Sequence, residues 1–242
     1  MAITGAGAQA GNDIYVGTGS PEGAVTAGIG TLYLRTDGSS GTAVYIKEVG
    51  TAATGWKASL TAGTSEPTVD ASGLATYRTN MRRVQVGSNL AALTTQVMLS
   101  SAIYLYEGDV VTNLTYLSGG TAAGTPTNYW YALYSNAATP ALLAQTADQT
   151  STAWAANTAI TLALAAPYTV TASGVYYAAI MVKATTVPTL AGATLENAAA
   201  GGAVIATQKI LAQTSGSALT TTAPGTIATP TTVATVPLVI AT

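Results

Sequence analysis

Cysteine and histidine are both absent from this 242-residue sequence, and each absence excludes a class of chemistry. Without cysteine the chain has no disulfide, no thiol nucleophile and no thiolate ligand for a metal. Without histidine it has no imidazole base and no histidine-ligated zinc or iron. We therefore expect no metal and no cofactor. The stability of the fold has to come from packing, strand pairing and association with other surfaces.

Charge is also scarce. Charged residues make up 7% of the chain and the formal net charge is −2, whereas ordinary soluble domains carry roughly 25% charged residues. Affinity for nucleic acid depends on neutralising phosphates, which eight scattered Lys and Arg residues cannot supply. No apolar run approaches the length of a membrane-spanning helix, about 18 residues. Solvated faces must consist of Thr, Ser, Asn, Gln and backbone groups, which suits contacts with proteins or with sugars.

Phenylalanine is the third absence, so large apolar bulk comes from Leu, Ile, Val, thirteen tyrosines and three tryptophans. Aromatic and β-branched side chains fit a pleated, half-buried surface, which favours strands. Most alanines lie beside Thr, Gly or Pro, and no capping box leads into a long helical stripe. The pattern therefore excludes a mainly helical protein and leaves open only a short helical turn near Ala147–Asn157.

Short strand patterns run through the whole chain, with turn residues at about 8–12-residue spacing. In the first region the expected strands are Asp13–Val16, Thr31–Arg35, Ala43–Val49 and Gly55–Ser59. In the second region they are Gln96–Tyr106, Asp109–Leu117, Asn128–Tyr134, Ala141–Gln145, Ile160–Leu164, Tyr168–Thr171, Gly174–Lys183, Ala203–Leu211 and Val236–Ile240, with Pro126 and Pro167 among the breaks. This pattern predicts an all-β fold: a small N-terminal β-hairpin module followed by a jelly-roll-like β-sandwich.

The distribution of charge divides the chain. Residues 1–83 hold six of the eight basic and six of the ten acidic residues. We expect a glycine-rich β module for docking or oligomerisation at residues 1–60, a linker at 61–83 and a β-sandwich domain at 84–242. Strands as short as those of the module bury little apolar area by themselves. We therefore expect the module to pack against copies of itself or against a larger body.

The module carries a dense motif. It runs Gly17-Thr-Gly-Ser-Pro-Glu-Gly-Ala-Val-Thr-Ala-Gly-Ile-Gly-Thr-Leu-Tyr-Leu-Arg-Thr-Asp-Gly38 and continues through Ala43–Glu48 and Thr54–Lys57. This pattern resembles a module of tailed-bacteriophage fibres, spikes and other virion appendages. The second region is similar to β-domains of phage minor structural proteins, especially of actinobacterial phages, in the stretches Leu105–Thr115, Tyr129–Tyr134, Gly174–Tyr177 and Val187–Leu190.

The resemblance implies a virion structural protein on the external surface of a phage particle, rather than an enzyme. It would be a tail-fibre, minor tail or capsid-decoration component that forms a homotrimer and contacts other virion proteins. Tail and capsid placement stay open. One alternative is a carbohydrate-binding protein that adheres to the host surface, and a less favoured one is a polysaccharide depolymerase.

Aromatic residues are the candidates for a ligand-binding surface: Tyr129, Trp130, Tyr131 and Trp154. Strand alternation places Tyr129 and Tyr131 on one face and Trp130 on the other. In a protein without phenylalanine such rings favour a place in the core. A sugar-binding platform is the alternative.

Two charged pairs are the remaining candidates. Arg82 and Arg83 form a basic step at the domain junction, either as a solvated pair or as a docking site for an acidic neighbour. Glu107 and Asp109 flank Gly108 between two expected strands, where acids are ordinary turn residues. A glycosidase pair or a calcium site is the less favoured interpretation of these two acids.

Overall fold

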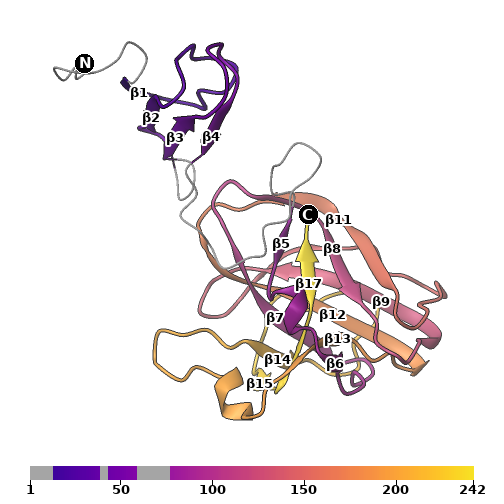
Figure 1. Ribbon diagram of the computed structural model, residues 1–242. Helices are drawn as coiled ribbons and strands as arrows, with labels where there is room; N and C mark the ends of the chain where they lie inside the picture. Colours follow the sequence, from indigo (N-terminus) through magenta and orange to yellow (C-terminus); the bar gives the residue numbers. More distant parts are fainter. Residues whose placement is uncertain (1–12, 39–42, 59–76) are drawn as a thin grey trace. The chain divides into compact units, whose positions relative to one another are not determined.

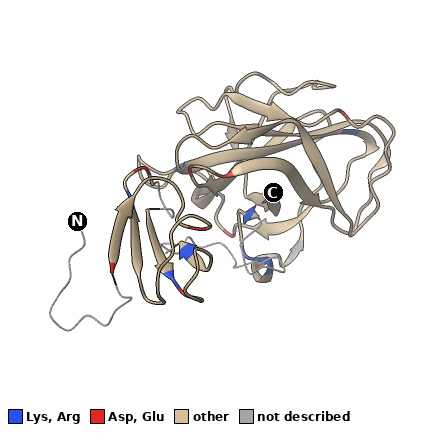
Figure 2. Ribbon diagram, turned by 90° about the horizontal axis from the view of Figure 1, so that it is seen from above, with Lys and Arg blue, Asp and Glu red and all other residues tan. Residues whose placement is uncertain are grey.

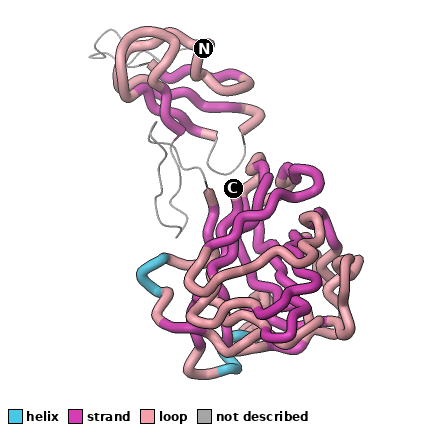
Figure 3. Tube along the Cα trace, turned by 90° about the vertical axis from the view of Figure 1, so that its right-hand side faces the viewer, coloured by secondary structure: helices cyan, strands magenta, loops and turns pink. Residues whose placement is uncertain are grey.

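The computed structural model describes residues 13–38, 43–58 and 77–242, which form two compact units (Figure 1). Almost all of the regular structure is strand (Figure 3). Helical structure in the described ranges is limited to two short 3-10 turns, η1 at Arg83–Gln85 and η2 at Ala198–Gly201. The described part of the chain contains no helix with the length and apolar character to cross a membrane. The prediction of an all-β fold is confirmed.

The first unit, called the module below, is a four-stranded sheet in the order β1-β2-β3-β4. Its strands are β1 (Ile14–Gly17), β2 (Leu32–Arg35), β3 (Val44–Lys47) and β4 (Trp56–Ala58), close to the predicted ranges. Strands β2, β3 and β4 form an antiparallel meander, whereas β1 pairs with β2 in parallel. A parallel pair needs a long connection rather than a tight turn, and residues 18–31 supply it.

The second unit is built from two larger sheets and one small sheet. The six-stranded sheet, in the order β10-β9-β12-β7-β14-β15, consists of β7 (Met98–Leu105), β9 (Gly124–Tyr134), β10 (Leu142–Gln145), β12 (Gly174–Thr186), β14 (Ala212–Ser215) and β15 (Thr231–Thr232). The four-stranded sheet, in the order β11-β8-β17-β5, consists of β5 (Arg78–Thr79), β8 (Val110–Leu117), β11 (Ala159–Thr169) and β17 (Val239–Ala241). The small sheet contains β6 (Ser88–Asn89), β13 (Ala191–Thr194) and β16 (Thr235–Pro237).

The six-stranded sheet is buried on both faces. Tyr129, Tyr131 and Leu133 of β9 belong to a large core cluster that also contains residues of β8, β11 and β17 from the other sheet. Trp130 and Tyr134 alternate to the opposite face, where Ala223 and Ile227 from the segment before β15 belong to a second cluster. The two packed sheets fit the expected sandwich, and its jelly-roll connectivity stays a prediction.

Several local predictions are wrong. Residues 203–211 form no strand, and the strand of this region is β14, which begins at Ala212. Its register is set by pairing with β7, from Ala212 opposite Ser101 to Ser215 opposite Met98, and such a distant partner leaves no local signal. The short helical turn that the sequence left open near 147–157 does not form, and these residues contain loops, turns and an isolated bridge at Trp154.

The two prolines read as breaks lie inside strands. Pro167 is part of β11, which lies at the edge of its sheet and whose register shifts between Ala163 and Tyr168. Pro126 is part of β9 next to another register shift. Proline lacks a backbone donor and is tolerated in sheets at edges and irregularities, which explains both positions.

The expected linker at 61–83 is too long at its C-terminal end. Arg78 and Thr79 form β5, which pairs with β17 through Ala241 and Ile240. Asn80 then donates from its side chain to the carbonyl of Pro237 at 2.8 Å. Residues 78–80 therefore belong to the second unit, and the part of the linker at 61–76 lies outside the described residues.

Candidate functional site

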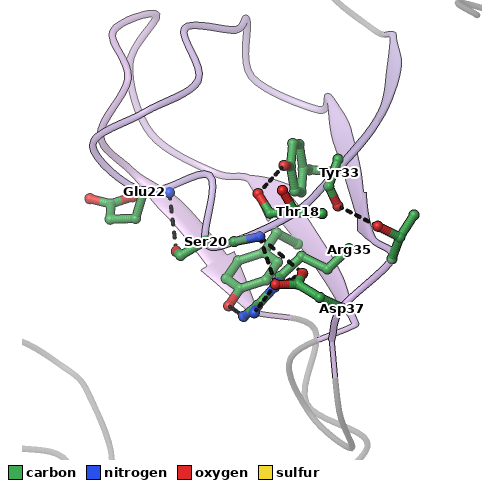
Figure 4. A network of polar contacts seen from close by, with 10 residues as sticks. Thr18, Ser20, Glu22, Tyr33, Arg35 and Asp37 are labelled. Carbon is green, nitrogen blue, oxygen red and sulfur yellow. Dashed lines mark hydrogen bonds and ion pairs between the residues drawn. The ribbon is translucent and has the colours of Figure 1, made fainter.

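The motif of the module folds into one connected polar network (Figure 4). The carboxylate of Asp37 accepts hydrogen bonds from the backbone N–H of Gly19 at 2.9 and 3.0 Å. It also accepts from Nε and Nη2 of Arg35, at 3.1 and 3.2 Å. The hydrogen bond from Arg35, followed by the one from Gly19, lowers the pKa of Asp37. This pair fixes the connection between β1 and β2 to the end of β2.

Glu22 fixes the same connection to β4. Its carboxylate accepts hydrogen bonds from the backbone N–H groups of Gly55 at 2.9 Å and Trp56 at 2.8 Å. The indole N–H of Trp56 donates in return to the carbonyl of Val25 at 2.7 Å. The Gly-Ser-Pro-Glu-Gly and Thr-Gly-Trp segments of the motif therefore bind each other directly.

Lys47 is fully buried beneath the turn that follows β3. Its ammonium donates to the carbonyl of Ala52 at 2.6 Å and to that of Thr54, and it lies 5.8 Å from the centre of the Trp56 ring. A buried ammonium is stable only when it is paired with such acceptors. Four charged residues of the motif thus bind partners within the module and help to build its fold: Glu22, Arg35, Asp37 and Lys47.

The module sheet has two apolar faces, and only one forms a core. Tyr33, Tyr45 and Trp56 are buried together on the inner face, in edge-to-face ring contacts, with Ala27 from the connection. Side chains alternate between faces along each strand. The opposite side, here called the outer face, carries six aliphatic residues that are exposed or half-buried: Ile14, Val16, Leu32, Leu34, Val44 and Ile46.

The outer face is continuous across three strands. Leu32 lies between Ile14 and Ile46 in the register of the sheet, and Leu34 lies between Val16 and Val44. Val16 is 59% exposed. A contiguous apolar patch on a small soluble protein marks a site of interaction. This face is therefore the candidate functional surface of the module.

The aromatic candidates lie in the interior of the second unit. Trp130 is 0% and Trp154 is 1% exposed. Their indole N–H groups donate to the carbonyls of Thr220 and Thr158, at 2.7 and 2.8 Å. Tyr129 and Tyr131 are also fully buried and contact the Trp154 ring. These rings are core residues, so the alternative of an exposed sugar platform does not hold in this structure.

Three buried tyrosine hydroxyls make no hydrogen bond to any described residue: those of Tyr116, Tyr129 and Tyr131. The centres of the Tyr116 and Tyr131 rings lie 4.7 Å apart, between the two sheets. Burial raises the pKa of both phenols well above the ordinary value. They stay neutral at physiological pH and serve as neither base nor nucleophile there.

The charged candidates lie in different settings. Arg82 and Arg83 are exposed at the start of η1, so a docking role for them stays a prediction. Asp109 binds Arg78 through two hydrogen bonds of 2.7 Å, which tie β8 to β5. Gly108 has a φ of 89°, as a tight turn allows glycine. The turn interpretation of residues 107–109 therefore fits, and no described group of three or more acids could hold a metal ion.

Comparison with known proteins adds no relative: the sequence matches no protein-family model, and no curated protein resembles it closely enough to count as a match.

Sequence reasoning missed the outer face as a surface, although its signal is present. Leu32-Tyr-Leu34 and Val44-Tyr-Ile46 are apolar at every position, whereas a strand with one solvated face alternates apolar and polar residues. Two apolar faces in one small sheet indicate a second partner. Short strand length alone led to the expectation that the module packs against another surface.

Proposed function

We propose that this chain is a structural component of a tailed-bacteriophage particle that associates with copies of itself through the outer face of the module. The observation that carries the proposal is the continuous aliphatic surface from Ile14 to Ile46. Support for the phage context is the resemblance of residues 17–57, in which Glu22, Arg35 and Asp37 bind partners within the module. Tail-fibre, minor tail and capsid-decoration roles all fit.

The small core of the module is a reason to expect an external partner. Within the described ranges its hydrophobic cluster contains four buried residues: Ala27, Tyr33, Tyr45 and Trp56. Units of this size usually need disulfides, metals or oligomerisation to be stable. The sequence has no cysteine, and the residues described hold no metal cluster. Association is the remaining route.

A second copy of the chain is the partner that fits best. The outer face is aliphatic, so an identical face is complementary to it, and each side chain stabilises by roughly 1.5–3 kcal/mol when fully buried. Charge does not oppose self-association because the whole chain carries a net charge of only −2. The second unit has few charged residues, and most of its ribbon in Figure 2 is neutral.

The alternatives suggested by the sequence lose the residues on which they rested. The rings of Trp130 and Trp154 are buried and cannot stack on a sugar at the surface. Asp109 is held by Arg78 in a bidentate ion pair, so it is not arranged with Glu107 as an acid–base pair. No observation favours the depolymerase interpretation.

The oligomeric state of the full chain tests the proposal. Light scattering coupled to size exclusion, over a wide range of concentrations, is expected to give an oligomer. Leu34→Glu places a charge in the outer face and should give a monomer. Thr51→Glu adds the same charge at an exposed turn of the module and should leave the oligomer intact.

Folding of the variants has to be followed at the same time. Leu34→Thr is a milder change because threonine fits a strand, and it should weaken association while the amide spectrum of the module is preserved. A wild-type chain that stays monomeric at every concentration contradicts the proposal. An oligomer that persists in a folded Leu34→Glu variant contradicts it as well.

The phage assignment needs its own experiment. Mass spectrometry of purified particles should detect the chain, and antibody labelling in the electron microscope should place it. Hundreds of copies over the shell indicate capsid decoration, whereas a handful at one end of the tail indicates a fibre or minor tail protein. Particles without the chain would overturn the assignment.

A further inference from the structure

A cavity of about 690 Å³ opens beside the six-stranded sheet of the second unit. Three connections form its walls: residues 137–140 between β9 and β10, 203–210 before β14, and 227–230 before β15. Its floor is formed by Tyr177 of β12, Gln213 of β14 and Ile227, which are all buried. Sites for small molecules in proteins usually measure roughly 300–1,000 Å³. The cavity is therefore large enough for a small ligand.

Gln213 gives the floor a polar group without a protein partner. Its side chain lines the cavity, and the residue is 2% exposed. Its backbone carbonyl accepts from the hydroxyl of Ser100, but its side-chain amide hydrogen-bonds to no residue in the described ranges. An amide can make up to four hydrogen bonds, so Gln213 offers a ligand in the cavity both donors and acceptors.

The walls add further neutral polar groups. The hydroxyls of Thr139, Thr207 and Thr229 line the cavity and make no side-chain hydrogen bond within the described part of the chain. Thr229 also has a φ of 42°, which is strained for a β-branched residue. Gln208 accepts from the backbone N–H groups of Val204 and Ile205 through Oε1. Its side-chain N–H groups are thereby left for a ligand.

The lining carries almost no charge. Lys209 is the only charged residue in it, and its ammonium donates to the carbonyls of Asn136 at 2.9 Å and Ala137 at 3.1 Å. Burial raises the pKa of Tyr177, so its hydroxyl stays neutral. An anionic ligand would meet a single ammonium, two of whose three N–H groups are already used, and a cation would lack a carboxylate. A wholly apolar ligand would leave the Gln213 amide unpaired.

We propose that this cavity is a binding site for a neutral saccharide of one or two sugar units. Sugar hydroxyls would hydrogen-bond to the Gln213 amide and to the threonine hydroxyls, and the C–H faces of the ring would pack on the alanine and proline walls. The site lies at a different place from the aromatic core residues. It does not depend on self-association of the module, so each of the two proposals can fail without the other.

Nuclear magnetic resonance of the isotope-labelled full chain tests the site. The probes are methyl glycosides of glucose, galactose, mannose, rhamnose and N-acetylglucosamine, with N-acetylneuraminic acid as a charged comparison. At least one neutral glycoside should shift the side-chain amide of Gln213 and the backbone amides of Thr207 and Thr229. The acidic sugar should shift none of them. If no neutral glycoside shifts these resonances, the proposal is wrong.

Gln213→Met separates a binding role from a structural one. Methionine has a similar volume and no hydrogen-bonding amide, so the variant should be as stable as the wild type or more stable. It should bind the responding glycoside at least about tenfold more weakly, as expected for the loss of about 1.4 kcal/mol of hydrogen bonding. Unchanged affinity in the folded variant overturns the proposal, as does a variant that loses stability and keeps binding.

Two further variants complete the test. Ala206→Trp fills the cavity from its exposed wall and should abolish binding while the fold is kept. Thr161→Val removes an exposed threonine hydroxyl from β11 in the other sheet, where it contacts Thr115, and should bind like the wild type. Binding that survives Ala206→Trp, or that is lost in Thr161→Val, places the sugar elsewhere and contradicts the assignment.

Discussion

The two units of this protein obtain their structure in different ways. The second unit buries large side chains on both faces of its central sheet, among them Trp130 and Tyr131 of a single strand. The hydrophobic core of the module has four described residues, and the module depends on polar contacts that connect distant parts of its sequence, such as Glu22 with Gly55 and Trp56. A large apolar core stabilises the second unit, whereas particular hydrogen bonds supplement the small core of the module.

The two units also differ in the polar groups that make their contacts. Glu22, Arg35, Asp37 and Lys47 of the module all bind groups within the module. In the second unit the exposed faces use hydroxyls instead, as in the 2.7 Å contact between Thr115 and Thr161 across β8 and β11. Charged side chains of the module therefore supply directional contacts that supplement its small core.

Trp130→Ala should have the largest effect on the second unit. Removing a fully buried indole leaves a cavity and should lower the free energy of unfolding of that unit by about 3–5 kcal/mol. Trp56→Ala should instead unfold the module, since it removes one of the three rings of its hydrophobic core, and leave the second unit unchanged. Urea titration followed through the amide resonances of each unit measures both changes. Loss of both units in either variant would show that they do not fold independently.

Glu22→Gln should cause the next largest loss of stability, in the module. The neutral amide keeps an acceptor oxygen but loses the charge that strengthens the contacts with Gly55 and Trp56. We expect the module to lose about 1 kcal/mol of stability. Glu48→Gln is the matched control, because Glu48 is exposed on the same unit. Equal stability of the two variants in urea titrations would show that the network is not needed.

Tyr131→Phe and Tyr134→Phe should have different effects on the stability of the second unit. The Tyr131 hydroxyl is buried without a partner in the described structure, so its removal should leave the second unit unchanged or stabilise it by up to about 1 kcal/mol. The Tyr134 hydroxyl donates to the carbonyl of Pro224 at 2.7 Å, so its loss should destabilise by about 1 kcal/mol. Chemical denaturation compares the two variants. A clear loss of stability in Tyr131→Phe would mean that its hydroxyl has a partner.

Low pH should destabilise the module through protonation of Asp37, and this is the smallest of the expected changes in stability. Its pKa in the folded chain lies below the ordinary value of 3.8 because Arg35 and Gly19 bind the charged form. The stabilisation is therefore complete above about pH 4 and is lost as pH falls through the lowered pKa. Asp37→Asn should remove this part of the pH dependence. A carboxyl resonance of Asp37 that titrates at or above the ordinary value would contradict the contact.

The sequence predicted the parts of the fold that depend on local pattern. All four strands of the module and the alternation of Tyr129, Trp130 and Tyr131 in β9 follow from residue type and spacing. The wrong predictions concern contacts between distant residues. The two-residue strand β5 exists only because β17 pairs with it.

The candidate sites also depend on contacts between residues that are distant in the sequence. The apolar residues of the outer face were visible in the sequence, but their union into one surface depends on the parallel pairing of β1 with β2. The cavity brings Gln213 beside Thr139 and Thr229, from three separate segments. No spacing rule connects these residues, because loops rather than regular elements place them. Such a site is found only once the chain is folded.

The position of β17 has a consequence for biosynthesis. This strand, Val239–Ala241, lies between β8 and β5 and supplies Val239 and Ala241 to the core. The sheet that it completes cannot close while these residues are still inside the ribosome. A nascent chain that already contains β5, β8 and β11 can pair β8 with β11, but β5 has no partner strand until β17 has left the ribosome. Chaperone binding to stalled nascent chains should fall sharply once this strand emerges.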